Sequence, residues 1–154
     1  MESLDRIDLS ILALLQQDGR ITNQELAERV SLSTAPCLRR VRRLEELGYI
    51  ERYVAVVNRA ALGLNVMALV SVSLNSFTDA GVRAFESFIE SNAHITECYS
   101  VSGEYDFQLK IVASSMQEVE SILLKQLLRL DIVRNATTNF VLGERKNTTV
   151  VPVS

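Results

Sequence analysis

The spacing of apolar residues changes along this chain of 154 residues, and that change constrains the fold more than any other feature. Up to Gly48, apolar side chains recur every three or four residues, which is typical of amphipathic helices. From Val66 onward, short segments rich in β-branched residues alternate with amphipathic helical segments. The sequence therefore predicts an α+β chain with a helical N-terminal part and a C-terminal part that contains a sheet.

Three helices are predicted in the N-terminal part, at about 5–18, 23–30 and 33–47. Each begins with a residue that can cap it: Asp5, Thr22 and Ser33. Asp8 and Glu25 stand three residues after the first two caps, in the position that completes a capping box. Pro36 falls in the first turn of the third helix, where its missing N–H costs nothing.

The rest of the chain is expected to form one strand, a linker and a second domain. Residues 49–58 are rich in β-branched and aromatic side chains, which predicts a strand at about 50–57. With the three helices it would complete a winged helix-turn-helix domain over residues 1–58, followed by a linker at 59–65. The second domain, 66–150, is predicted to be a ferredoxin-like βαββαβ unit. Its strands are expected at 66–74, 95–101, 106–113 and 132–142, and its helices at 79–91 and 116–130.

Positive charge is concentrated in the third predicted helix, although the whole chain has a net charge of −3. Residues 33–43 contain four arginines and no acidic residue. At about 100° per residue, these arginines share one side of the helix and the apolar residues take the opposite side. They are Arg39, Arg40, Arg42 and Arg43. Such a helix can bury one face on its two predecessors and present a basic face to a partner.

A short helix, a tight turn and a basic second helix form a helix-turn-helix, which fits the major groove of duplex DNA. Arginine pairs bidentately with guanine and with phosphate oxygens. Ser33 and Thr34, at the start of the third helix, offer hydroxyl and amide groups to a phosphate. The alternative is a solvated helix face, on which the arginines pair with neighbouring acids such as Glu45 and Glu46.

Other features argue against several classes of protein. No apolar run reaches the ~18 residues that span a bilayer, and the acidic N-terminus is unlike a secretory signal, so we expect a cytoplasmic protein with no membrane partner. Cys37, Cys98 and His94 lack metal-site spacing, and we expect neither a metal, a disulfide nor a cofactor. No nucleophile–base pair or phosphate-binding loop has a recognisable signature, so an enzyme is not expected.

Several segments resemble the Lrp/AsnC (feast/famine) transcription regulators, and together they extend from Leu4 to about Val150. They are Leu4-Asp5-Arg6-Ile7-Asp8, Asp18-Gly19-Arg20-Ile21-Thr22-Asn23, Pro36-Cys37-Leu38-Arg39-Arg40-Val41-Arg42-Arg43-Leu44-Glu45, Gly48-Tyr49-Ile50 and Val101-Ser102-Gly103-Glu104-Tyr105-Asp106. The resemblance implies an operator-binding helix-turn-helix over Asn23 to Arg42, Pro36 included. It also implies a C-terminal domain that forms dimers and often octamers, with amino acids bound between neighbouring dimers.

The same resemblance places the amino-acid site at the loop of Ser102, Gly103, Glu104, Tyr105 and Asp106. Backbone N–H groups at Gly103 can face a carboxylate, and Glu104 or Asp106 can hold an ammonium group. Thr137 and Thr138, on the last strand, are candidate hydroxyls for a second wall. From the residues alone, a hairpin turn with solvated acids explains the loop more simply, and Tyr105 would also suit an interface.

The sequence thus predicts a homo-oligomeric, sequence-specific DNA-binding transcription regulator that responds to a small amino acid. A nucleoid-type architectural protein without an effector response would use the same helix-turn-helix and remains an alternative. A stand-alone amino-acid-binding module is disfavoured, because it would have no use for the basic helix.

Overall fold

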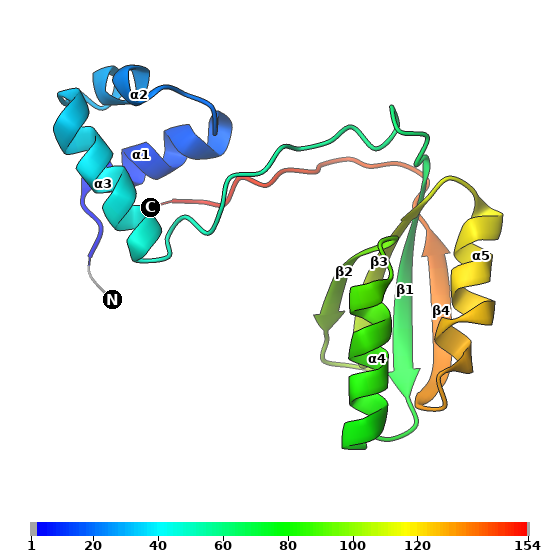
Figure 1. Cartoon of the computed structure of the whole chain (residues 1–154). Coiled ribbons are helices and arrows are strands. Elements are labelled where there is room, and N and C mark those ends of the chain that lie inside the picture. The colour runs from blue at the N-terminus through cyan, green and yellow to red at the C-terminus, as the bar shows by residue number, and fades with distance from the viewer. Residues whose placement is uncertain (1–2, 154) are drawn as a thin grey trace. The chain divides into compact units, whose positions relative to one another are not determined.

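The computed structural model describes residues 3–153, and these divide into two compact units (Figure 1). Unit 1 consists of the described residues up to Val56 together with those from Lys146 onward. Unit 2 runs from Val57 to Arg145. The sequence analysis extended the C-terminal domain to residue 150, whereas the structure groups the residues after Arg145 with the N-terminal helices.

Unit 1 is built on three helices, as predicted: α1 (Arg6–Gln17), α2 (Asn23–Arg29) and α3 (Thr34–Glu46). The capping boxes at Asp5 and Thr22 are both formed. Ser33 occupies the cap position of α3, but its side chain makes no capping hydrogen bond. Apolar side chains from all three helices meet in one core, which includes Ile11, Leu26, Cys37 and Leu44.

The segment that follows α3 corrects the predicted strand at 50–57. Residues 50–58 are extended but form no strand within the described chain. A strand requires a hydrogen-bonded neighbour, and the β-branched composition alone does not supply one. Val56 is 81% exposed, so the side chains that suggested a strand are largely in solvent. The start of the segment still packs on unit 1: Ile50 lies against the core of the three helices, and the hydroxyl of Tyr53 donates to Oε1 of Glu45 at 3.0 Å.

Unit 2 has the predicted βαββαβ order. Its elements are β1 (Val66–Leu74), α4 (Asp79–Ser91), β2 (Ile95–Ser100), β3 (Phe107–Ala113), α5 (Met116–Lys125) and β4 (Val133–Phe140). The strands form one antiparallel sheet in the order β2-β3-β1-β4, which is the ferredoxin-like arrangement. Both helices cover the same face of this sheet (Figure 1), and no helix of unit 2, as far as the structure describes it, lies on the other face.

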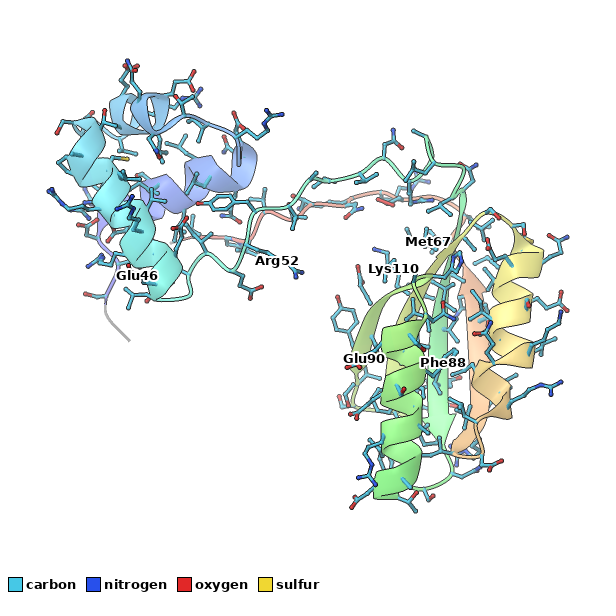
Figure 2. The ribbon with its side chains drawn as sticks, in the orientation of Figure 1. Glu46, Arg52, Met67, Phe88, Glu90 and Lys110 are labelled. Atoms are coloured by element: carbon cyan, nitrogen blue, oxygen red, sulfur yellow. The ribbon has the colours of Figure 1, made fainter. Side chains whose placement is uncertain are left out.

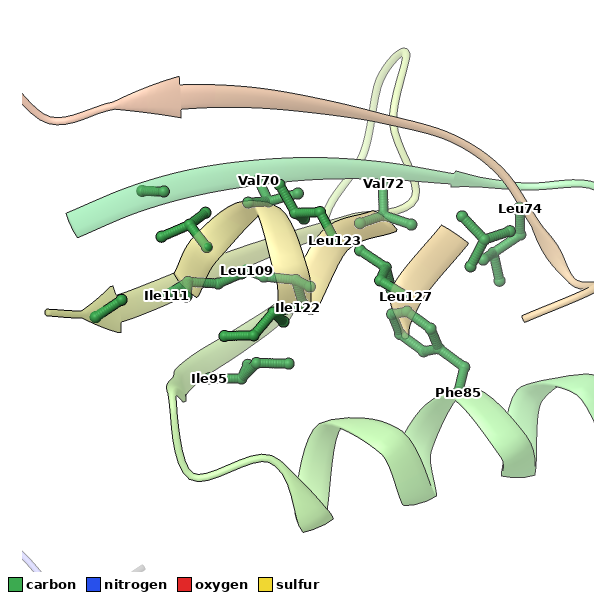
Figure 3. Close-up of a cluster of buried hydrophobic side chains, with 14 of the residues drawn as sticks. Val70, Val72, Leu74, Phe85, Ile95, Leu109, Ile111, Ile122, Leu123 and Leu127 are labelled. Atoms are coloured by element: carbon green, nitrogen blue, oxygen red, sulfur yellow. The ribbon is translucent and has the colours of Figure 1, made fainter. Parts of the chain in front are cut away.

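The core of unit 2 lies between the sheet and its helices (Figure 3). Alternate residues of β1 and β3, among them Val70, Val72 and Ile111, point into it because side chains alternate along a strand. Phe85 of α4 is 1% exposed, and its ring packs on that of Phe107 with centroids 4.7 Å apart. The helix expected at 116–130 instead ends at Lys125, and a short 3-10 turn at Leu127–Arg129 follows it.

Candidate DNA-binding and effector sites

The turn between α2 and α3 has the compact geometry of a helix-turn-helix. Ser31 adopts φ 55°, in the left-handed region that non-glycine residues rarely visit. The amide of Leu32 donates to the carbonyl of Ala27 at 2.9 Å and so closes the end of α2. α3 then begins two residues later, with Ser33 and Thr34 exposed and Pro36 half-buried in its first turn. Asn23, at the start of α2, is also exposed.

The structure separates the four arginines of α3 into two pairs. Arg39 and Arg42 are exposed, on the side of the helix away from the buried residues Cys37, Val41 and Leu44. Figure 2 shows the side chains of α3, with Glu46 labelled at its C-terminal end. The predicted basic face is therefore present, and two guanidinium groups of the described chain point to solvent from it.

Arg40 and Arg43 are instead engaged by carboxylates of α1 and its cap. Nη1 of Arg40 lies 2.7 Å from Oδ2 of Asp5 and 2.8 Å from Oδ1 of Asp8. Nη2 of Arg43 lies 2.7 Å from Oδ2 of Asp8. The backbone N–H of Asp8 and then the Arg40 guanidinium hold the pKa of Asp5 below its usual value.

Asp8 is the residue of this site that sequence reasoning missed. It was assigned only as the partner in a capping box, which it forms. Its contacts with α3 join residues 32 and 35 positions apart in the chain, and no spacing rule reaches that far. The one available signal was an acidic residue on the otherwise apolar side of an amphipathic helix.

The loop between β2 and β3 is open to solvent at its centre. Ser102, Gly103 and Glu104 are exposed. Gly103 has φ +121°, which disfavours other residues, and a Cβ built there would meet no atom within 4 Å. Tyr105 is half-buried, and its hydroxyl lies 3.3 Å from Oγ1 of Thr137 on β4. The structure therefore brings this loop and Thr137 together, as the sequence analysis expected of a two-walled site.

Two other residues predicted for this site, Asp106 and Thr138, have different surroundings from those expected. Oδ2 of Asp106 accepts a hydrogen bond of 2.7 Å from the backbone N–H of Leu74, which fastens the loop to the end of β1. Thr138 pairs with Val70 and Thr137 with Ser71, and consecutive strand residues face opposite ways. Thr138 therefore points to the helix-covered side, away from Tyr105.

Thr138 contributes to an apolar cavity of about 350 Å³ between α5 and β4. Leu123, Leu124 and Leu128 form one wall of the cavity, and Ala136, Thr138 and Phe140 form the other. This cavity lies on the opposite side of β4 from the contact between Tyr105 and Thr137. Within residues 3–153, no three His, Cys, Asp or Glu side chains are placed to hold a metal ion, and no helix is long and apolar enough to cross a membrane.

Comparison with known proteins assigns the N-terminal helices and the sheet-containing part of the chain to two different families of domain. Residues 4–51 match the family described as winged helix-turn-helix DNA-binding, and residues 67–151 match the Lrp/AsnC ligand binding domain. The chain is 41% identical over 150 residues to a leucine-responsive regulatory protein of Rhizobium meliloti. That alignment covers 97% of this chain and 96% of the relative.

Solved structures of transcriptional regulators resemble this structure over nearly the whole chain. A transcriptional regulator from Neisseria meningitidis, crystallised in complex with L-Met, has a TM-score of 0.94 and 35% identity, with 97% of both chains covered. An AsnC family transcriptional regulator from Agrobacterium tumefaciens has a TM-score of 0.90 and 29% identity, also with 97% of both chains covered.

Proposed function

Because this chain belongs to the Lrp/AsnC family of transcriptional regulators, we propose that it recognises operator sites through α3 and that an amino acid bound by unit 2 modulates this recognition. The exposure of Arg39 and Arg42, opposite the buried face of α3, is the observation that carries the proposal. A helix with this arrangement can enter the major groove and still keep its packing on α1 and α2.

The described side chains suggest a division of tasks at the DNA. Arg39 and Arg42 are free to pair with guanine edges or phosphates. Asn23, Ser33 and Thr34 are exposed near the starts of α2 and α3, where backbone N–H groups attract phosphate. Pro36, half-buried in the first turn, fits the helix start without an unsatisfied amide. Arg40 and Arg43 act mainly through their ion pairs to Asp5 and Asp8.

We further propose that the chain works as a homodimer or larger oligomer in the cytoplasm. A two-fold dimer presents two recognition helices to sites about 34 Å apart, or a multiple of that distance, and so selects pseudo-palindromic DNA. An octamer engages several such sites and adds the cost of bending DNA to the selection.

Substitution of single arginines tests the DNA-binding surface. Specific fragments are first identified by genome-wide mapping of bound sites, and affinity is then measured by fluorescence anisotropy. Arg39→Ala and Arg42→Ala are expected to weaken specific binding by about 1–3 kcal/mol each, because each removes a guanidinium contact. Arg83→Ala is the matched control, since Arg83 is an exposed arginine on α4 of unit 2.

Two results would contradict this proposal. Wild-type affinity in both α3 variants would show that α3 is not the recognition element. Equal protection of promoter and random DNA in footprints would instead favour the architectural alternative.

For the effector, the open loop at Gly103 and the neighbouring Thr137 offer groups that match an amino acid. Backbone N–H groups at the loop suit the carboxylate, and the exposed carboxylate of Glu104 suits the ammonium. Asp106 supports the loop through its bond to Leu74. The relative from Neisseria meningitidis was crystallised with L-Met, so methionine and other apolar amino acids are the first to test.

Calorimetric titration of the common amino acids into the whole protein tests the effector proposal. At least one is expected to release heat, and Glu104→Gln is expected to weaken its binding because the ammonium loses a charged acceptor. Glu86→Gln, an exposed acid on α4, is the control. Absence of heat with every amino acid would overturn the effector proposal and leave the DNA-binding proposal unaffected.

A further inference from the structure

The carboxylate of Asp8 is fully buried and has charged partners on both oxygens. Its exposed fraction is 0%. Oδ1 accepts from Nη1 of Arg40 at 2.8 Å, and Oδ2 accepts from Nη2 of Arg43 at 2.7 Å. Oδ2 also accepts from the backbone N–H of Asp5 at 3.2 Å. One carboxylate of α1 therefore holds two consecutive turns of α3.

These contacts restrict how α3 can move on α1. Apolar contacts such as those of Ile11 with the α3 side of the core are non-directional and tolerate small rotations. A buried carboxylate is different, because losing a partner leaves an uncompensated charge away from water. Arg40 adds a second constraint through its 2.7 Å contact with Asp5. Rotation or sliding of α3 would break three short ion pairs at once.

The order of the arginines connects this restraint to the DNA-facing side. Each clamped arginine directly follows an exposed one: Arg40 follows Arg39, and Arg43 follows Arg42. Neighbouring residues on a helix point about 100° apart. Fixing the directions of Arg40 and Arg43 therefore also fixes the directions of Arg39 and Arg42.

We propose that Asp8 is a positioning residue for DNA recognition: by clamping Arg40 and Arg43 it sets the rotation of α3, and so the direction in which Arg39 and Arg42 enter the groove. This inference rests on the proposed DNA-binding role of α3. It assigns Arg40 and Arg43, whose side chains are 30% and 38% exposed, to holding α3 on α1, so that Arg39 and Arg42 supply the guanidinium contacts with DNA.

The salt dependence of binding distinguishes positioning from direct contact. The slope of log K against log salt reports the number of phosphates neutralised, at about −0.9 for each. In Asp8→Asn, we expect affinity for specific DNA to fall at least about tenfold, discrimination against random DNA to shrink, and the slope to stay at its wild-type value. Asp18→Asn is the control. Asp18 is an exposed acid after α1, and its carboxylate accepts a hydrogen bond from the backbone N–H of Arg20.

Two results for Asp8→Asn would contradict the positioning role. If Asp8→Asn binds as well as wild type, Asp8 does not position Arg39 and Arg42. If it binds more tightly with a steeper slope, Asp8 instead keeps Arg40 and Arg43 away from phosphates. Either outcome would overturn the proposal.

A second pair of variants covers the case in which Asp8→Asn does not fold, as its thermal melting would reveal. Arg43→Gln keeps the pair between Asp8 and Arg40 and is compared with Arg42→Gln. We expect Arg42→Gln to reduce the slope by about 1 or to relax base preference, and Arg43→Gln to lower affinity with an unchanged slope. A reduced slope in Arg43→Gln would make Arg43 a phosphate contact and overturn the proposal.

The variants also separate this inference from the function on which it rests. If Arg39→Gln and Arg42→Gln both bind like wild type, the recognition role of α3 fails. If those two weaken binding and Asp8→Asn does not, only the positioning role fails.

Discussion

The side chain of Tyr53 helps to hold the segment after α3 on the helices of unit 1. Burial raises its pKa to about 12, with the neighbouring Glu45 carboxylate as the second cause. A phenol whose folded pKa exceeds its unfolded value near 10 stabilises the fold below that pH, and the contribution is lost as the pH rises toward 12. The neutral phenol is thus the form that donates to Glu45.

We therefore expect the free energy of unfolding to fall between about pH 10 and pH 12 in a way that depends on Tyr53. Urea unfolding at a series of pH values should show a smaller alkaline loss in Tyr53→Phe than in wild type. Parallel pH curves for wild type and Tyr53→Phe would contradict the expectation.

At the candidate DNA-binding site, the sequence predicted the polar side of α3 but not the contacts that its arginines make. Periodicity predicted which side of α3 is polar, and Arg39 and Arg42 are exposed there. It did not predict that α1 covers one flank of that side, because the contact depends on where Asp5 and Asp8 lie in space. Membership of a polar face is a local property, whereas exposure depends on the whole domain.

At the scale of elements, periodicity and composition predicted the five α-helices and the four sheet strands of the described chain, although the last helix ends at Lys125 rather than at 130. The predicted strand at 50–57 was wrong, because a strand needs a partner and this segment has strand composition without a neighbour. The residues after Arg145 carry no pattern of their own, and the structure groups them with unit 1. Likewise, the contact of Tyr105 with Thr137 joins a loop and a strand that only the sheet brings together.

The packing of α4 gives an element-scale prediction at Gly81. A Cβ there would lie 2.6 Å from Cδ1 and 3.1 Å from Cβ of Ile132. Alanine favours a helix by about 1 kcal/mol over glycine, but overpacking costs about 1–3 kcal/mol. We expect Gly81→Ala to lower the free energy of unfolding of unit 2, as measured with urea.

A double-mutant cycle identifies the cause of that loss. Ile132→Val removes the Cδ1 atom, so Gly81→Ala should cost less in that background than in wild type. If the cost is the same in both backgrounds, contact with Ile132 is not the reason.

Helix α1 also receives the C-terminal residues. Nε2 of Gln16 donates to the carbonyl of Val151 at 3.1 Å, and the amide of Val151 donates to Oε1 of Gln16 at 2.7 Å. We expect Gln16→Ala to destabilise unit 1 by about 1 kcal/mol, the net value of exposed hydrogen bonds, as measured by thermal unfolding. Gln17→Ala, at the exposed next position, should change stability by less than about 0.5 kcal/mol.

For the whole molecule, the division into units makes unit 1 discontinuous in sequence. Val153 packs against its core, and Val151 pairs with Gln16. A chain that stops at Arg145 should therefore show faster hydrogen exchange in the amides of α1 and unchanged exchange in those of β1. Faster exchange in β1 would show that these last residues support unit 2 instead.

The discontinuity of unit 1 bears on the order in which the protein is made. Domains usually fold as they leave the ribosome, the N-terminal one first. Here α1, α2 and α3 emerge early, yet Val151 and Val153 arrive only after all of unit 2 has been synthesised. A nascent chain thus carries an unfinished unit 1 until Val151 and Val153 have been added, and a chain released after Arg145 would have all of unit 2 but an incomplete unit 1.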